Sequence, residues 1–93
     1  MKNKFLSAKD LSNIGEELIT PQIIKNIRKN YNLTQDAFSD LLGVKYNTYR
    51  SWEGGYKNPS SPAIALLQIA KKFPKIFLQN RKEILNFVRN NYF

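Results

Sequence analysis

The sequence contains neither cysteine nor histidine among its 93 residues. Without cysteine the chain cannot form a disulfide framework or a cysteine-based zinc or redox site. Without histidine it lacks the commonest general base and the commonest metal ligand. Asp36 and Asp40 are spaced i, i+4 like a catalytic carboxylate pair, but Asp36 suits the first-turn helix dipole and Asp40 a solvated position. We therefore expect no metal, no other cofactor and no enzymatic activity.

Long apolar runs are also missing. No stretch approaches the roughly 20 apolar residues that span a bilayer, and the first ten residues, MKNKFLSAKD, contain no apolar signal-peptide core. Four glycines and four prolines are too few for a low-complexity chain. These absences predict one small cytoplasmic domain with no membrane partner.

Acidic residues are few compared with basic ones. Fifteen Lys and Arg face seven Asp and Glu, which gives a net charge of +8 and a pI near 9.9. The first 20 residues carry three lysines against Asp10, Glu16 and Glu17, so the excess lies in the rest of the chain. Such a balance favours a polyanionic partner, whether DNA, RNA or an anionic membrane surface.

The stretch 33–59 carries the clearest local pattern. Thr34 is a good helix N-cap, and Gly43 is suited to the left-handed position that ends a helix. A second helix of about residues 45–53 has a polar side and places Tyr49 and Trp52 on the other side, towards the core. We interpret these features as two short helices joined by a tight turn, the arrangement of a helix-turn-helix.

Further helices are predicted on both sides of this pair. Thr20-Pro21 favours a helix that runs to about residues 31–32, and a serine before Pro62 starts another that Phe73-Pro74 closes. Apolar spacing in the tail predicts a helix over about 80–91, with room for a short turn before it. The fold class is therefore all-α, with five or six helices. We divide the chain into an arm or short helix over 1–19, a helix-turn-helix domain over 20–74, and a C-terminal helix within 75–93.

Several residues also occur in the order and spacing of a known family. They are Leu33, Thr34, Gln35, Phe38, Leu41, Leu42, Gly43, Val44, Thr48, Trp52, Glu53 and Gly55. With these residues the chain resembles the phage repressor/Cro (XRE-like) helix-turn-helix family over about residues 22–74. The resemblance implies a lambda-repressor-like fold. The stretches 59–63 and 66–70 are similar to the branch that includes HigA-type antitoxins and related small regulators.

The resemblance also implies a site. In this family the second helix of the pair meets base edges, and the start of the first helix contacts phosphate. Lysine and arginine suit guanine, asparagine suits adenine, and threonine or tyrosine can pack on the thymine methyl. Two residues in the loop after the second helix can either hold the DNA backbone or contact only water. The DNA-binding candidates, these two included, are Gln35, Lys45, Tyr46, Asn47, Thr48, Arg50, Ser51, Lys57 and Asn58.

Two further groups have structural roles in this interpretation. Arg28 and Glu53 match positions that form an ion pair in the resembled repressors, which would hold the second helix at a fixed angle. The tail residues Phe77, Ile84, Leu85 and Val88 have two alternatives: they cover the domain's own core, or they pair two copies of the chain about a two-fold axis.

The functional hypothesis is a dimeric, sequence-specific regulator of transcription. It would act as a repressor of its own or another promoter by binding a palindromic DNA operator through residues 45–53. The alternative is an antitoxin of a HigBA-like system, which binds a toxin protein first and regulates its operon second. RNA binding is disfavoured because the chain lacks the aromatic sheet and the GXXG loop of RNA-binding modules.

Overall fold

The computed structural model describes residues 18–91, and every regular element within that range is an α-helix. The helices are α2 (Pro21–Asn30), α3 (Gln35–Leu42), α4 (Tyr46–Glu53), α5 (Ser61–Lys72), α6 (Pro74–Gln79) and α7 (Arg81–Asn91). The all-α expectation of five or six helices is confirmed. Of the predicted N-terminal arm, residues 1–17 lie outside the described part of the chain.

The helix starts follow the capping chemistry of the sequence. Thr20, Thr34 and Ser60 each have extended backbone angles, and each side-chain oxygen accepts a hydrogen bond from the N–H three residues later. Proline occupies the first turn of both α2 and α5, where a missing N–H costs nothing. The predicted starts of these three helices are therefore confirmed.

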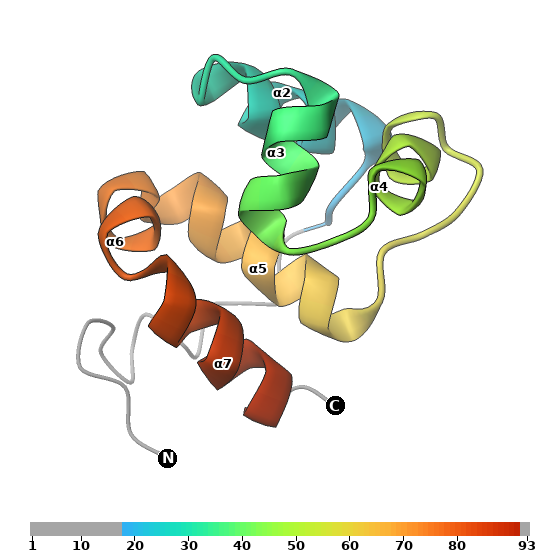
Figure 1. The fold of residues 1–93 in the computed structure, drawn as a ribbon. Helices are drawn as coiled ribbons and strands as arrows, with labels where there is room; N and C mark the ends of the chain where they lie inside the picture. The colour runs from blue at the N-terminus through green and yellow to red at the C-terminus, as the bar shows by residue number, and fades with distance from the viewer. Residues whose placement is uncertain (1–17, 92–93) are drawn as a thin grey trace.

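Helix α5 runs through the middle of the molecule (Figure 1). It packs against α2 on one side and against α6 and α7 on the other, while α4 contacts both α2 and α3. Every residue from Ala65 to Ala70 is buried, which is the pattern of a helix surrounded by its neighbours. The helix-turn-helix pair and the tail are therefore built on one shared core.

A chain of aromatic rings runs through that core. Tyr31 contacts Phe38 with ring centroids 5.3 Å apart, and Phe38 meets Tyr49 at 5.5 Å. Tyr49 meets Trp52 at 5.9 Å, and all but the first of these contacts are edge-to-face, a favoured geometry for aromatic pairs. Tyr49 and Trp52 are 0% and 5% exposed, so their predicted place in the core is confirmed.

The tail differs from its prediction in one respect. Instead of one helix with a short turn before it, residues 74–91 form two helices that meet at Asn80. Pro74 ends α5 as expected, but it also stands at the start of α6, a position that proline favours. Asn80 leaves the helical backbone region, and its side-chain amide donates to the Ile76 carbonyl over 3.1 Å.

This arrangement decides between the two alternatives for most of the tail stripe. Phe77, Ile84 and Val88 are at most 1% exposed within a single chain, so they cover the domain's own core. They are not available for the dimer contact that was the other alternative. Leu85 is half-buried and is the one member of the stripe that still reaches the surface.

Candidate nucleic-acid interface

Helix α4 presents a polar face to solvent. Tyr46, Asn47 and Arg50 are exposed on this helix, and Lys45 stands just before it as the N-cap residue. Among the described residues, no side-chain hydrogen bond or ion pair engages Lys45 or Asn47. These side chains are therefore free to bind a partner placed against this face.

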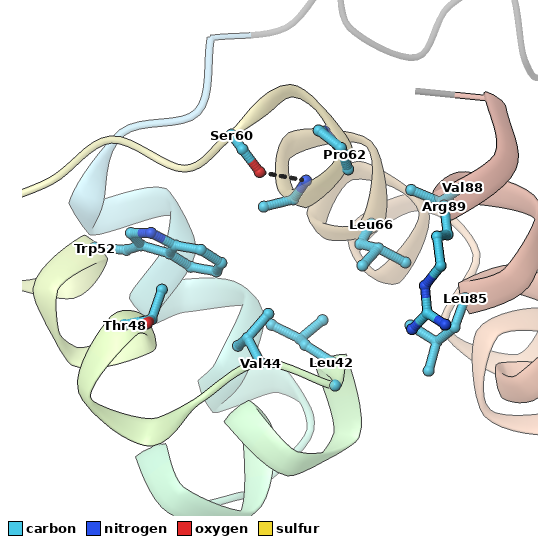
Figure 2. Close-up of a pocket in the computed structure, with 12 residues that line it drawn as sticks. Leu42, Val44, Thr48, Trp52, Ser60, Pro62, Leu66, Leu85, Val88 and Arg89 are labelled. Atoms are coloured by element: carbon cyan, nitrogen blue, oxygen red, sulfur yellow. Dashed lines mark hydrogen bonds between the residues drawn. The ribbon is translucent and has the colours of Figure 1, made fainter. Parts of the chain in front are cut away.

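Thr48 and Ser51 lie at the edges of that face. Thr48 lines a cavity of about 240 Å³ between α4, α5 and α7, together with Val44 and Trp52, and Figure 2 shows these three opposite Leu85, Val88 and Arg89. Ser51 is half-buried, and its hydroxyl donates to the Thr48 carbonyl over 2.6 Å. Thr48 is nevertheless exposed like Lys45, Tyr46 and Asn47, whereas Ser51 is less available to a ligand of this face.

The angle of α4 is set by the carboxylate of Glu53. Arg28 of α2 forms the predicted ion pair, with Nε 2.7 Å from Glu53 Oε2 and Nη2 3.2 Å from Oε1. The Tyr49 hydroxyl also donates to Glu53 Oε2. Since the Arg28 and Glu53 side chains are only 15% and 5% exposed, water competes little for these bonds. Arg28 in addition donates to the Leu33 carbonyl over 3.0 Å, which attaches the chain just before α3.

These contacts shift the acid–base behaviour of the group. Burial alone would raise the pKa of the Glu53 carboxyl, but hydrogen bonds from Arg28, Tyr49 and Gln35 outweigh it and lower that pKa below its ordinary value of 4.5. The hydrogen bond to Glu53 raises the pKa of Arg28, and burial raises the pKa of Tyr49. The network is therefore a carboxylate held by one cation and by neutral donors at neutral pH.

Gln35 belongs to the same network. Its side-chain Nε2 donates to Glu53 Oε1 over 3.0 Å, so the amide that was predicted to clamp a phosphate is engaged inside the domain. The amide retains a second N–H, and the backbone N–H groups of the first turn of α3 remain unpaired by the helix itself. A phosphate contact at the start of α3 would therefore come from these groups.

The loop after α4 returns across its C-terminal end. The N–H groups of Tyr56 and Lys57 both donate to the Ser51 carbonyl, over 2.9 and 3.2 Å. Lys57 and Asn58 are exposed, and Tyr56 is 87% exposed. The two predicted backbone-binding residues are thus accessible, directly after the exposed face of α4.

Arg81 is a structural residue that the sequence did not indicate. It stands at the start of α7, and its guanidinium donates to the Leu41 carbonyl over 2.6 Å and to the Asp40 carbonyl over 2.7 Å. These are carbonyls of the last turn of α3, which lack partners within that helix. The contact joins residues 40 positions apart, and no local sequence pattern predicts it.

Two kinds of site are not found in the part of the chain that the structure describes. Residues 18–91 contain no cluster of three or more carboxylates that could hold a metal ion. No helix in this range is long and apolar enough to cross a bilayer.

Comparison with known proteins agrees with this geometry. The family described as the antitoxin component of the bacterial toxin–antitoxin system, MqsA, matches residues 5–81. Antitoxin HigA-2 of Vibrio cholerae is 30% identical over 70 residues, which cover 75% of this chain and 67% of that protein. Antitoxin MqsA of Escherichia coli is 29% identical over 70 residues, which cover 75% of this chain and 53% of MqsA.

A third relative is a regulator of another kind. The helix-turn-helix transcriptional regulator AnsR of Bacillus subtilis is 39% identical over 44 residues, which cover 47% of this chain and 38% of AnsR. No solved structure matches the chain significantly. The chain spans about two thirds of the length of HigA-2, about half of MqsA and less of AnsR. Because the family match covers most of the sequence, the chain belongs to the MqsA antitoxin family of helix-turn-helix proteins.

Proposed function

We propose that the protein is a sequence-specific, double-stranded DNA-binding regulator of transcription that inserts α4 into the major groove of an operator. The observation that carries this proposal is the contrast between the two sides of α4. One side is fixed by the Glu53 network, while the other exposes Lys45, Asn47 and Arg50 without a hydrogen-bonded protein partner in the described structure. A rigid helix with free polar side chains is what direct reading of bases requires.

The chemistry of these side chains matches the groove. Lysine and arginine can donate to guanine O6 and N7, and asparagine can form a paired contact with adenine N6 and N7. Lys57, exposed in the loop after α4, and the first turn of α3, which packs against α4, would hold the phosphate backbone. Relatives that are named as antitoxins and as a helix-turn-helix transcriptional regulator support the same role.

The proposal includes a homodimer that acts as an autorepressor in the cytoplasm. One helix-turn-helix reads few base pairs, and two copies on half-sites one helical turn apart read a palindrome. With Phe77, Ile84 and Val88 in the core, the dimer contact would form on other surfaces, to which Leu85 can contribute.

A second function, which the family match favours, is binding of a toxin protein. The relatives HigA-2 and MqsA carry the name antitoxin, and the family description refers to a toxin–antitoxin system. The HigA-like stretch from Pro59 onward supplies little surface for a toxin, since Ala63 and residues 65–70 are buried. We therefore place the toxin contact elsewhere, with the predicted arm over 1–19 as the first segment to test.

The two functions are separated by one pair of measurements. In a gel shift, the wild type is expected to retard DNA from upstream of its own gene at two chains per site, with affinity that falls steeply as salt rises. Asn47→Ala and Arg50→Ala should each abolish the specific shift. Equal binding of this DNA and of a scrambled duplex would reject the proposal of operator binding. Failure to co-purify the product of a neighbouring gene would reject the proposal of toxin binding.

A further inference from the structure

Two exposed residues of α4 contact each other. The Arg50 guanidinium carbon lies 5.4 Å from the centre of the Tyr46 ring, within the range of a cation–π contact. The two residues are four positions apart, so they lie on the same face of the helix, one turn apart. Tyr46 is 41% exposed, and among the described residues it makes no side-chain hydrogen bond.

The contact arranges the donors of Arg50. Its guanidinium is planar, its N–H donors project from the edges of that plane, and none of them is hydrogen-bonded to the described part of the protein while the guanidinium carbon lies over the Tyr46 ring. A guanine presents two acceptors, O6 and N7, at a spacing that suits two parallel N–H donors. No carboxylate forms an ion pair with this guanidinium in the described structure, where Glu53, on the other side of α4, pairs with Arg28.

We propose that Tyr46 is a specificity-determining positioning residue, which holds the Arg50 guanidinium in the orientation that reads a guanine. This inference rests on the proposed DNA-reading function. It adds that Arg50 reads a guanine and that Tyr46 orients Arg50 for this contact. An arginine already held in place loses less side-chain freedom on binding, and this preorganisation favours the paired contact over looser contacts with other bases.

The inference differs from direct base contact by Tyr46. A tyrosine that packs on a thymine methyl would specify its own base pair, at a position distinct from the one that Arg50 reads. A positioning tyrosine has no base of its own, and its loss changes the preference at the position that Arg50 reads. The two roles therefore predict different positions of altered preference.

The test is selection from a randomised duplex DNA library, followed by sequencing of the bound pool. It uses the full-length wild type, Tyr46→Phe, Tyr46→Leu, Tyr46→Gln, Arg50→Ala and the double variant Tyr46→Leu/Arg50→Ala. We expect Arg50→Ala to remove a guanine preference at one position of each half-site. Tyr46→Leu and Tyr46→Gln should weaken that same preference by about threefold to tenfold, while Tyr46→Phe, which keeps the ring, retains it.

Three outcomes would overturn the proposal. The first is a wild type that selects a sequence whose guanine preference survives both leucine and glutamine at position 46. The second is loss of preference in these variants at a position that Arg50→Ala does not affect. The third is a double variant, Tyr46→Leu/Arg50→Ala, whose base preference at any position of the half-site is weaker than that of Arg50→Ala alone. A wild type that selects no sequence would instead reject the proposed function itself. Circular dichroism melts of each variant check that it still folds. Folding should be retained, because the Tyr46 side chain is partly exposed.

Discussion

At the scale of single residues, Glu53 is the side chain that joins three helices through hydrogen bonds. Its two carboxylate oxygens accept hydrogen bonds from α2, from the start of α3 and from within α4. A charge that is 5% exposed is stable only while such donors are present, because burial of an unpaired charge is costly. Glu53 therefore helps to fix the orientation of α4 against α2 and α3.

Replacement of this carboxylate should lower stability strongly. Glu53→Ala leaves the Arg28 guanidinium without its partner, and we expect the free energy of unfolding to fall by about 2–4 kcal/mol. Urea denaturation followed by circular dichroism measures the change. The matched control is Glu83→Ala, which removes an exposed glutamate of α7 and should change stability by less than about 0.5 kcal/mol. Equal stabilities of the two variants would contradict a structural role for Glu53.

The lowered pKa of Glu53 predicts a specific dependence of stability on pH. The folded-state pKa lies below the ordinary value of 4.5, so the ionised carboxylate stabilises the fold above that value and this contribution disappears as acid titrates the group. The stability gap between the wild type and Glu53→Gln should therefore be larger at about pH 7 than at about pH 3. Denaturation curves at both values measure the gap, and a gap that is constant or wider in acid would exclude this linkage.

Residue roles could be predicted from the sequence where a known pattern reaches them. The Arg28–Glu53 pair joins residues 25 positions apart and followed from the family resemblance, and the core positions of Tyr49 and Trp52 followed from helical spacing as well. The engagement of the Gln35 amide did not follow, because one side chain can bind a phosphate or a carboxylate and only the three-dimensional structure shows the carboxylate within reach.

At the scale of elements, the turn between α3 and α4 depends on Gly43. This residue has a φ of +72°, which side chains with a Cβ rarely adopt, and its N–H closes α3 on the Asp40 carbonyl. A Cβ added here would lie 3.5 Å from the Leu85 side chain, an ordinary contact, so strain in the backbone is the main cost of substitution.

Gly43→Ala should accordingly destabilise the protein by about 1 kcal/mol through its backbone alone. Asparagine tolerates the left-handed region better than alanine, so Gly43→Asn is expected to lose less stability in spite of its larger side chain. Thermal melts of the two variants give the order. A larger loss with asparagine would mean that contact with Leu85, rather than backbone strain, limits this position.

Arg81 joins the tail to the helix-turn-helix. Its guanidinium donates to the Leu41 carbonyl and to the Asp40 carbonyl, which also accepts from the Gly43 N–H, at the negative end of the α3 dipole. Arg81→Ala should reduce the free energy of unfolding by about 1.5–3 kcal/mol, as expected for hydrogen bonds from a charged donor. The control is Lys82→Ala, the exposed neighbour, which removes the same charge. An equal effect of the two changes, measured by urea denaturation, would refute the role of these bonds.

Three of the six helices in residues 18–91, α2, α3 and α5, were predictable because their starts carry capping signals. The tail was predicted incompletely, since Pro74 reads equally well as the end of one helix and as the start of the next, and α6 is only six residues long. Its burial was also ambiguous. An apolar stripe covers a core or a second chain with the same sequence pattern, and only the packing of Phe77, Ile84 and Val88 against the rest of the domain separates these alternatives.

At the scale of the whole molecule, a small core supports both the helix-turn-helix and the tail, and the chain carries a net charge of +8. Such a charge attracts any nucleic acid, so binding as such does not test whether α4 reads a sequence. Two exposed cationic residues on different helices can distinguish general attraction of nucleic acid by positive charge from sequence reading by α4. Arg50 lies on the exposed face of α4, and Lys75 lies on α6.

The most direct measurement is a titration of DNA from upstream of the gene, and of a scrambled duplex, with the wild type, Arg50→Ala and Lys75→Ala at one salt concentration. Both variants lose one positive charge, so both should bind scrambled DNA slightly less well. If α4 reads the operator, Arg50→Ala loses about tenfold or more in the ratio of specific to scrambled affinity, whereas Lys75→Ala keeps the wild-type ratio. Equal ratios for all three proteins would contradict sequence reading by α4.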